Sequence, residues 1–318
     1  MTVTMTVTTS TTGSISTTIT ADVTSAAKTI VVQEDIYKGS TLLGTTYRNI
    51  RFTSTYAGLL AYPVSNLPLL FSMRVLLPSY SGPLVKLRRV LDNATRDFYA
   101  SSSGTLDVAA VNTWLAGSTA CIDTWYNQGS GPNATAPSTG AQPVMNLSGK
   151  IGAVYNNNQK LTVPSNILSL TNAGAEGTVL MVATGANTNA FTFGVIDSSS
   201  NRWAASLNFG DGNCYFDGGG AVQTYRSFVN STVAVLAQYT FKRNTYTQVL
   251  RKRGVTLTTG LHSGAQTTST AFGIGYCSGF LGGAGHTGQI SEFIMSNTAM
   301  SGTNFTTAEN DQISYWGV

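Results

Sequence analysis

The sequence predicts an all-β protein, and three observations lead to this class. Short apolar runs recur along the chain, as in VLMVA (179–183), AFTFGVI (190–196), RWAASLNF (202–209) and TVAVLAQYTF (232–241). Turns rich in Gly, Asn, Ser and Pro separate these runs, and this arrangement favours a β-sandwich or barrel. Helical spacing of apolar residues is confined to two short segments.

Those two segments predict short helices. In LDVAAVNTWLAG (106–117), apolar residues recur close to helical spacing, and Gly117 marks the end. In TTAENDQISYWGV, which closes the chain, Thr306 and Glu309 match a capping box. We therefore expect the last helix to begin at Thr306 and to pack Ile313 and Trp316 against the sheet.

The N-terminal residues predict a separate β segment. TVTMTVT (2–8) alternates strictly and puts Val3, Met5 and Val7 on one face. Such a segment is either an arm that pairs with a neighbouring subunit or a disordered terminus. Strand-like patterns continue to Tyr62. We expect residues 1–65 to form an N-terminal β arm and extension used for assembly or docking, and residues 66–318 to form the main domain.

The composition indicates a polar surface with little charge. Charged residues make up 10% of the 318 residues and give a net charge of +4, against about 25% in an average protein. The basic stretch 241–253 could meet an anionic partner, but two strands with solvent-facing basic residues explain it better. The apolar run 66–78 is too short to span a bilayer. We therefore expect no membrane and no specific nucleic acid among the partners.

Cysteine and histidine residues predict neither a disulfide framework nor a metal site. Cys121, Cys214 and Cys277 have no CxxC partner, and His262 and His286 are isolated in Gly/Ser-rich stretches. We expect no cofactor. The first residues show no signal-peptide pattern, so production in a cytoplasm is expected.

Several motifs follow one another in the order found in a known family. YSGPLVKLRRVLDNATRDFY (80–99), CIDTWYNQGSGPNAT (121–135) and AFGIGYCSGFLGGAGHTGQISEFIMS (271–296) carry the likeness. From about residue 67 to 318 the chain resembles the catalytic domain of fungal α-L-arabinofuranosidase B. It is also similar to the concanavalin A-like, or LamG-like, domains of phage and giant-virus structural proteins. The resemblance implies a concanavalin A-like jelly-roll β-sandwich.

The same resemblance raises the question of catalysis. A retaining glycosidase needs two carboxyl groups that face each other across the sugar. The family's glycine-turn Asp would fall on or beside Cys277, and its Glu nucleophile in the carboxylate-free stretch 202–209. The usual Tyr-Asp-Gln is replaced by Tyr126-Asn127-Gln128. These losses predict that the protein is no enzyme but a virion structural protein (a capsid, decoration or fibre subunit), localised in the virion.

Two alternatives remain open. A lectin-like carbohydrate- or receptor-binding module would bind glycans through stacked aromatics and polar side chains. Its candidate residues are Trp125, Tyr126, Asn127, Gln128, Trp203, Tyr215 and Tyr276, although a core position is favoured for the two tryptophans. An active glycoside hydrolase with relocated acids would draw on Asp197, Asp211, Asp217 or Glu292. Expected partners are further copies of the chain, other virion proteins and host surface glycans.

Overall fold

The structure is a computed structural model. Contacts divide the chain into two units, residues 1–54 and 55–318, and each is described by itself. The described residues are 2–3, 21–22, 28–38, 41–52, 59, 62–186, 188–198, 201–219, 225–262, 264–266, 271–279 and 285–318.

The first unit is described as backbone strands. Strand β1 (Thr2–Val3) pairs with β2 (Ala21–Asp22), and β3 (Lys28–Lys38) forms an antiparallel hairpin with β4 (Thr41–Phe52). Of the three residues assigned to an assembly arm, Val3 lies in β1, whereas Met5 and Val7 fall outside the described residues. The role of this segment in assembly, and the functional division at residue 65, stay predictions.

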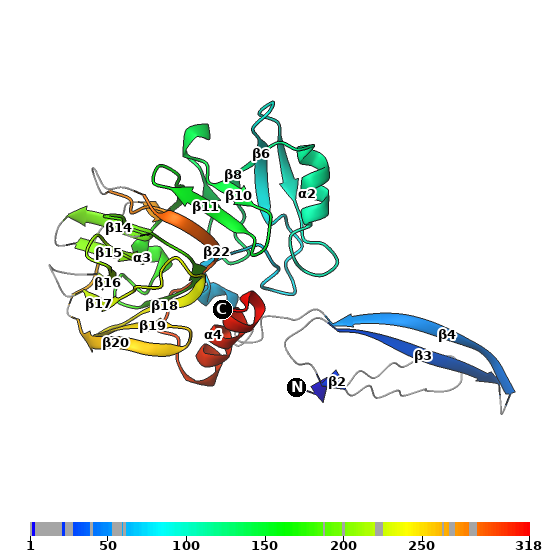
Figure 1. The fold of residues 1–318 in the computed structure, drawn as a ribbon. Helices are drawn as coiled ribbons and strands as arrows, with labels where there is room; N and C mark the ends of the chain where they lie inside the picture. Colours follow the sequence, from blue (N-terminus) through cyan, green and yellow to red (C-terminus); the bar gives the residue numbers. More distant parts are fainter. Residues whose placement is uncertain are drawn as a thin grey trace. The chain divides into compact units, whose positions relative to one another are not determined.

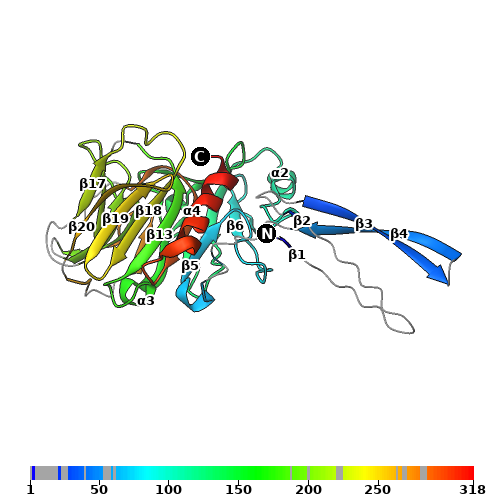
Figure 2. The same ribbon diagram turned by 90° about the horizontal axis from the view of Figure 1, so that it is seen from below.

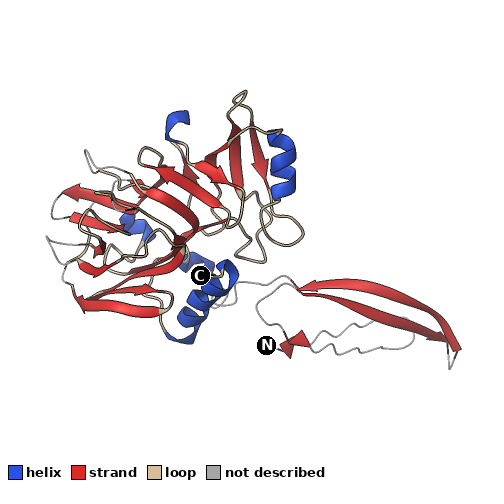
Figure 3. Ribbon diagram, viewed as in Figure 1, coloured by secondary structure: helices blue, strands red, loops and turns tan. Residues whose placement is uncertain are grey.

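The second unit is built almost entirely from strands (Figures 1 and 3). Its strands are β5 (Leu69–Ser72), β6 (Val85–Arg89), β7 (Thr95–Phe98), β8 (Ala120–Trp125), β9 (Ala134–Thr135), β10 (Val144–Asn146), β11 (Gly152–Asn156), β12 (Leu161–Asn166), β13 (Gly177–Ala183), β14 (Phe193–Ser198), β15 (Asn201–Ser206), β16 (Asn213–Gly218), β17 (Arg226–Val229), β18 (Ala237–Asn244), β19 (Thr247–Lys252), β20 (Val255–Leu261), β21 (Ala271–Ile274) and β22 (Thr287–Ser296). Its helices are α2 (Val108–Leu115), α3 (Ile167–Leu170) and α4 (Gly302–Trp316), with short 3₁₀ turns at Val64–Asn66 and Thr139–Ala141.

Antiparallel pairing arranges these strands in two facing layers. The first layer runs β5–β22–β13–β18–β19–β20. The second runs β12–β21–β14–β15–β16–β17. Strands β6, β7, β8 and β10 extend the first layer through β11, which pairs with β22. The predicted all-β sandwich is confirmed.

Aromatic side chains from both layers fill the core. The Phe193 ring of the second layer packs edge-on against Phe241 and Phe293 of the first, at centroid distances of 5.2 and 5.3 Å. Trp203 has no exposed surface. Because side chains alternate along a strand, the inward position of Trp203 turns Arg202 and Ala204 to the outer face of the second layer.

The Trp-Tyr-Asn-Gln motif has a structural role in this fold. Trp125 is fully buried. The Asn127 and Gln128 side chains each accept a 2.7 Å hydrogen bond from the backbone, at Leu70 and Leu76 respectively. These bonds satisfy buried backbone groups near β5. The motif therefore holds β5 in place.

Both predicted helices are present, but the last one begins earlier than expected. Helix α2 spans Val108–Leu115, within the predicted range. Helix α4 begins after Ser301 and lies against β13 and β18 (Figure 2). The capping-box prediction is wrong, because the Glu309 side chain bonds residues of β18 and β19 and does not cap the start of the helix. It pairs with Arg251 at 2.8 Å and accepts a hydrogen bond from Thr240.

The basic stretch 241–253 lies in β18 and β19, as expected, but several of its charges do not face solvent. Arg243 is fully buried and donates hydrogen bonds to backbone carbonyls, and burial lowers its pKa to about 10. Arg251 pairs with Glu309. The expectation of a solvent-facing basic surface is therefore wrong for these two residues, because they anchor loops and α4.

Candidate functional site

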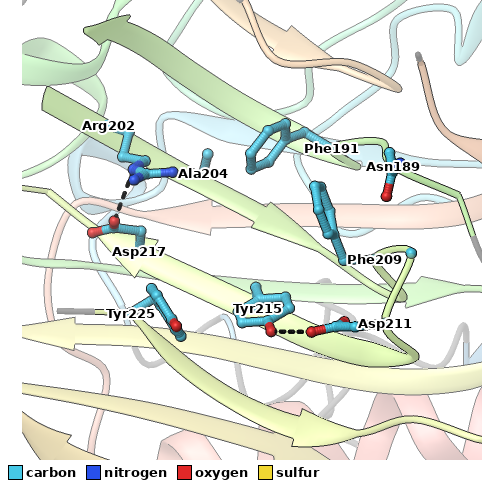
Figure 4. A pocket seen from close by; sticks show the side chains of 10 residues that line it. Asn189, Phe191, Arg202, Ala204, Phe209, Asp211, Tyr215, Asp217 and Tyr225 are labelled. Carbon is cyan, nitrogen blue, oxygen red and sulfur yellow. Dashed lines mark hydrogen bonds and ion pairs between the residues drawn. The ribbon is translucent and has the colours of Figure 1, made fainter. Parts of the chain in front are cut away.

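A cavity of about 490 Å³ opens on the outer face of the second layer (Figure 4). This size is within the range of pockets that hold small ligands. Strands β15 and β16 form its floor, and residues before β14 and β17 complete it. Its lining residues are Asn189, Phe191, Arg202, Ala204, Phe209, Gly210, Asp211, Tyr215, Asp217 and Tyr225.

The β15–β16 hairpin places the floor residues. Its turn contains Asp211 and Gly212, and Gly212 has φ +84°, which glycine adopts without strain. The register sets Ala204 directly opposite Asp217. Side chains opposite each other share one face with Cβ atoms about 5 Å apart. The Asp217 carboxylate therefore stands beside Ala204 on the cavity floor.

Asp217 is the most strongly held carboxylate of the cavity. Its Oδ2 lies 3.1 Å from the Nε of Arg202, and its Oδ1 lies 3.4 Å from the Nε2 of His262. The Asp217 residue is 5% exposed and His262 is 3% exposed. A negative charge is thus fixed in position, with a guanidinium beside it and an imidazole behind it.

Asp211 sits in a different environment. It lies in the exposed turn, where the Tyr215 hydroxyl donates a hydrogen bond to it (Figure 4). This bond is the main reason that the pKa of Asp211 is lowered and the pKa of Tyr215 is raised. Figure 4 shows Asp211 and Asp217 at opposite ends of the cavity, with Tyr215 between them.

The two carboxylates are too far apart to act on one glycosidic bond. The Cα atoms of Asn213 and Asp217, four residues apart in an extended strand, are separated by about 13 Å. Asp211 precedes Asn213 in the chain, so its backbone lies beyond the end of this stretch. The paired carboxyl groups of glycosidases lie about 5 to 9.5 Å apart. Asp211 and Asp217 therefore do not form a carboxylate pair of the glycosidase kind in this cavity.

Aromatic rings form a continuous wall. Phe191 lies 6.1 Å from Phe209, Phe209 lies 6.0 Å from Tyr215, and Tyr215 lies 4.9 Å from Tyr225, measured between ring centroids. The last two contacts are edge-to-face. Such a wall gives a ligand apolar and ring contacts.

Cys277 contacts residues that line the cavity but is not itself among them. It packs with Ala204 and Ile196 in a small buried cluster, against which Phe191 rests. Burial raises the pKa of its thiol well above the usual value. A buried thiol of this kind is unreactive. All three cysteines are free and buried.

Of the seven residues proposed for carbohydrate binding, Tyr215 lines the cavity. Trp125 and Trp203 are fully buried, which confirms the core interpretation for these two. Asn127 and Gln128 support the backbone near β5. The remaining two tyrosines lie on other strands or loops, where the Tyr126 hydroxyl donates to Asp97 at 2.7 Å and the Tyr276 hydroxyl lies 2.8 Å from Thr162 Oγ1.

The candidate carboxylates are also separated by the fold. Asp211 and Asp217 line the cavity. Glu292 is fully buried, where it binds Arg74 and the indole of Trp316 in α4. Asp197 belongs to β14, but its side chain falls outside the described part of the chain.

Sequence reasoning missed several residues of this site. Arg202, Phe209 and Tyr225 line the cavity, and His262 supports Asp217. Alternation in RWAASLNF, read together with the Asp-Gly turn that follows, could have placed Arg202 and Asp217 on one face. Nothing local connects His262 to Asp217, which lies 45 residues earlier.

Among the described residues, no group of three or more His, Cys, Asp or Glu side chains is placed to hold a metal ion. No helix in the same residues is both long and apolar enough to cross a membrane.

Residues 70–307 match the family model described as "Alpha-L-arabinofuranosidase B, catalytic". An arabinofuranosidase complexed with arabinofuranosyl-α-1,2-xylobiose is similar in structure, with a TM-score of 0.60 and 16% identity. An α-L-arabinofuranosidase soaked with a cyclic sulfate inhibitor gives 0.59 and 15%. In both cases 81% of this chain is covered, and the match spans 65% of the other chain. No curated protein matches the chain.

These matches correct the functional expectation. The structural likeness confirms the jelly-roll fold. The expected non-catalytic virion protein is contradicted, because the matching family model describes a catalytic domain and the similar structures are glycoside hydrolases. The expectation rested on the absence of acids in the stretch 202–209 and at Cys277 and Asn127, whereas Asp217, one of the candidate relocated acids, lies on the adjacent strand opposite Ala204.

Proposed function

This chain belongs to the family of the α-L-arabinofuranosidase B catalytic domain, and from that premise we propose that it hydrolyses α-L-arabinofuranosides at the Asp217 cavity. The observation that carries the proposal is Asp217 itself. Its carboxylate lines the cavity beside Ala204 and is held by Arg202. Because the chain spans 65% of the similar arabinofuranosidases, the activity and the substrate are proposals for this chain.

Asp217 has the charge that the reaction needs. Glycoside hydrolysis passes through a transition state in which the sugar ring carries positive charge. A carboxylate fixed in a partly closed cavity stabilises that charge without having to reorganise. Arg202 and His262 supply the fixation from two sides.

The described cavity provides less for the leaving group than for the sugar ring. Departure of a sugar hydroxyl requires a proton from a general acid. Among the described lining residues, Asp211 is the other carboxylate, and it stands at the opposite end of the cavity. We therefore expect substrates whose leaving group departs as a stable anion to react first.

The test is release of 4-nitrophenolate from 4-nitrophenyl α-L-arabinofuranoside. We expect turnover by the full chain, and a loss of about a hundredfold or more in D217N, the typical cost of removing a group that stabilises the transition state. D211N is the matched control, since it makes the same change at the exposed rim, and it should retain most of the activity. No turnover above buffer would refute the proposal, and equal activity of D217N and wild type would refute the role of Asp217.

A further inference from the structure

We infer that the cavity binds an aromatic group on the leaving side of the glycoside, so that the substrate class is a phenolic arabinoside rather than an arabinosyl-decorated polysaccharide. This inference rests on the proposed function and specifies its substrate.

The aromatic wall supports the first part of the inference. Phe191, Phe209, Tyr215 and Tyr225 follow one another with centroid distances of 4.9 to 6.1 Å. Rings at these distances attract each other beyond the effect of the area that they bury, and the two contacts made by Tyr215 have the favoured edge-to-face geometry. A ligand ring inserted beside Phe209 would continue the same series of contacts.

The distribution of polar groups supports the second part. Arg202 and Asp217 stand together at one end, while Phe191 and Phe209 lie away from them (Figure 4). Asn189 and Asp211 belong to the exposed rim. A second sugar against the two phenylalanines would bring hydroxyl groups out of water with few partners, and each unpaired hydroxyl weakens binding. An arene has no such groups.

The basicity of the leaving group also favours a phenolic arabinoside. A phenolate is a much weaker base than a sugar alkoxide, so it can leave without a proton from the protein. Asp211, the other carboxylate among the described lining residues, does not reach the bond that Asp217 faces. The wall that would bind an aryl group and the lack of a nearby proton donor among the described lining residues thus favour the same substrate.

The experiment compares two ligands that glycosidases cleave poorly, phenyl and methyl 1-thio-α-L-arabinofuranoside, by titration calorimetry with the full chain. We expect the phenyl compound to bind at least tenfold more tightly. Phe209→Leu and Tyr225→Ala should remove most of this difference, because they weaken binding of the phenyl compound far more than binding of the methyl compound. Tyr246→Ala is the matched control, since Tyr246 is 73% exposed and does not line the cavity.

The outcomes separate the two proposals. Equal affinity for the two thioglycosides would overturn the aromatic inference and leave the proposed hydrolase standing. Preference for phenyl that persists in both cavity variants would also overturn it. Failure of both ligands to bind, together with no release of 4-nitrophenolate, would refute the proposed function itself. The wild-type comparison does not depend on the folding of any variant.

Discussion

Asp217 faces Ala204 across the β15–β16 pair, on the cavity floor and not in the core. The family resemblance implies a carboxylate in the stretch 202–209, and this chain has none there. A carboxylate on the adjacent strand reaches the same face, because directly opposite Cβ atoms lie only about 5 Å apart. The charge that the proposed reaction requires is therefore present, displaced by one strand.

Replacing Cys277 with Asp should supply a proton donor near Asp217, which the described lining residues of the cavity lack. Cys277 packs beside Ala204, and Ala204 stands opposite Asp217, so we expect the new carboxyl group to come near Asp217, as in the paired carboxyl groups of glycosidases. Burial raises the pKa of such a group, which keeps it protonated as a general acid. General acid catalysis contributes about 10² to 10⁴, so C277D should cleave an arabinosyl disaccharide at least tenfold faster than wild type.

The control for this variant is C277N, because the Asn side chain has the shape of Asp but its amide cannot act as a general acid. Thermal unfolding must show both variants folded. Equal rates for C277D and C277N on the disaccharide would mean that the position does not reach the glycosidic oxygen.

His262 should act as a positioning residue for Asp217. Its Nε2 lies 3.4 Å from Asp217 Oδ1, and it is nearly fully buried. H262L leaves that oxygen without support, and a displaced carboxylate lowers kcat by about tenfold to a hundredfold. H262Q keeps a polar group in reach and should recover most of the rate. Steady-state kinetics should show the loss in kcat with little change in KM, whereas equal losses in both variants would indicate a structural role alone.

The strands and the core could be predicted from local patterns. Alternation in RWAASLNF places Trp203 inside, and the Asp211-Gly212 pair makes the hairpin turn that the sequence suggests. The alternation of apolar residues and the residue types in a turn are local properties of the chain, so a single sequence is enough to predict them.

The site could be predicted only in part, because its residues meet through long-range contacts. Asp211, Asp217 and Tyr215 were candidates, but the pairing of Asp217 with His262 depends on the return of the chain after β20. The proximity of Cys277 to Ala204 depends likewise on β21 reaching β14. Such contacts leave no trace in residue spacing.

The buried charge cluster beneath α4 should be the most sensitive point of the sandwich. Arg74 pairs with Glu292 and with Asp311, each at 2.8 Å. R74M leaves two carboxylates without their counter-charge, a change that costs about 3 to 5 kcal/mol of unfolding free energy when the ions are buried. Urea unfolding measures the loss.

The matched control for R74M is R89M. Arg89 pairs with Asp92 at 2.6 Å on a much more exposed surface, where solvent screening leaves an ion pair little net effect on the free energy of unfolding. Similar losses in the two variants would show that the Arg74 cluster does not hold the C-terminal helix as described.

His286 should make the stability of the sandwich depend on pH. Burial lowers its pKa from 6.5 to about 4, and its ring packs against Tyr155 with 5.9 Å between centroids. Between these two pKa values the unfolded chain binds a proton that the folded chain does not, so stability rises with pH in this window and falls as pH drops from 6.5 towards 4. The shift corresponds to about 3 kcal/mol in total. Urea unfolding of wild type at pH 7 and pH 4.5 should differ by more than that of H286Q, whatever the overall stability of the variant. If the difference between pH 7 and pH 4.5 is equal in both proteins, the acid sensitivity comes from other groups. Paired carboxylates that become protonated as the pH falls are one such source.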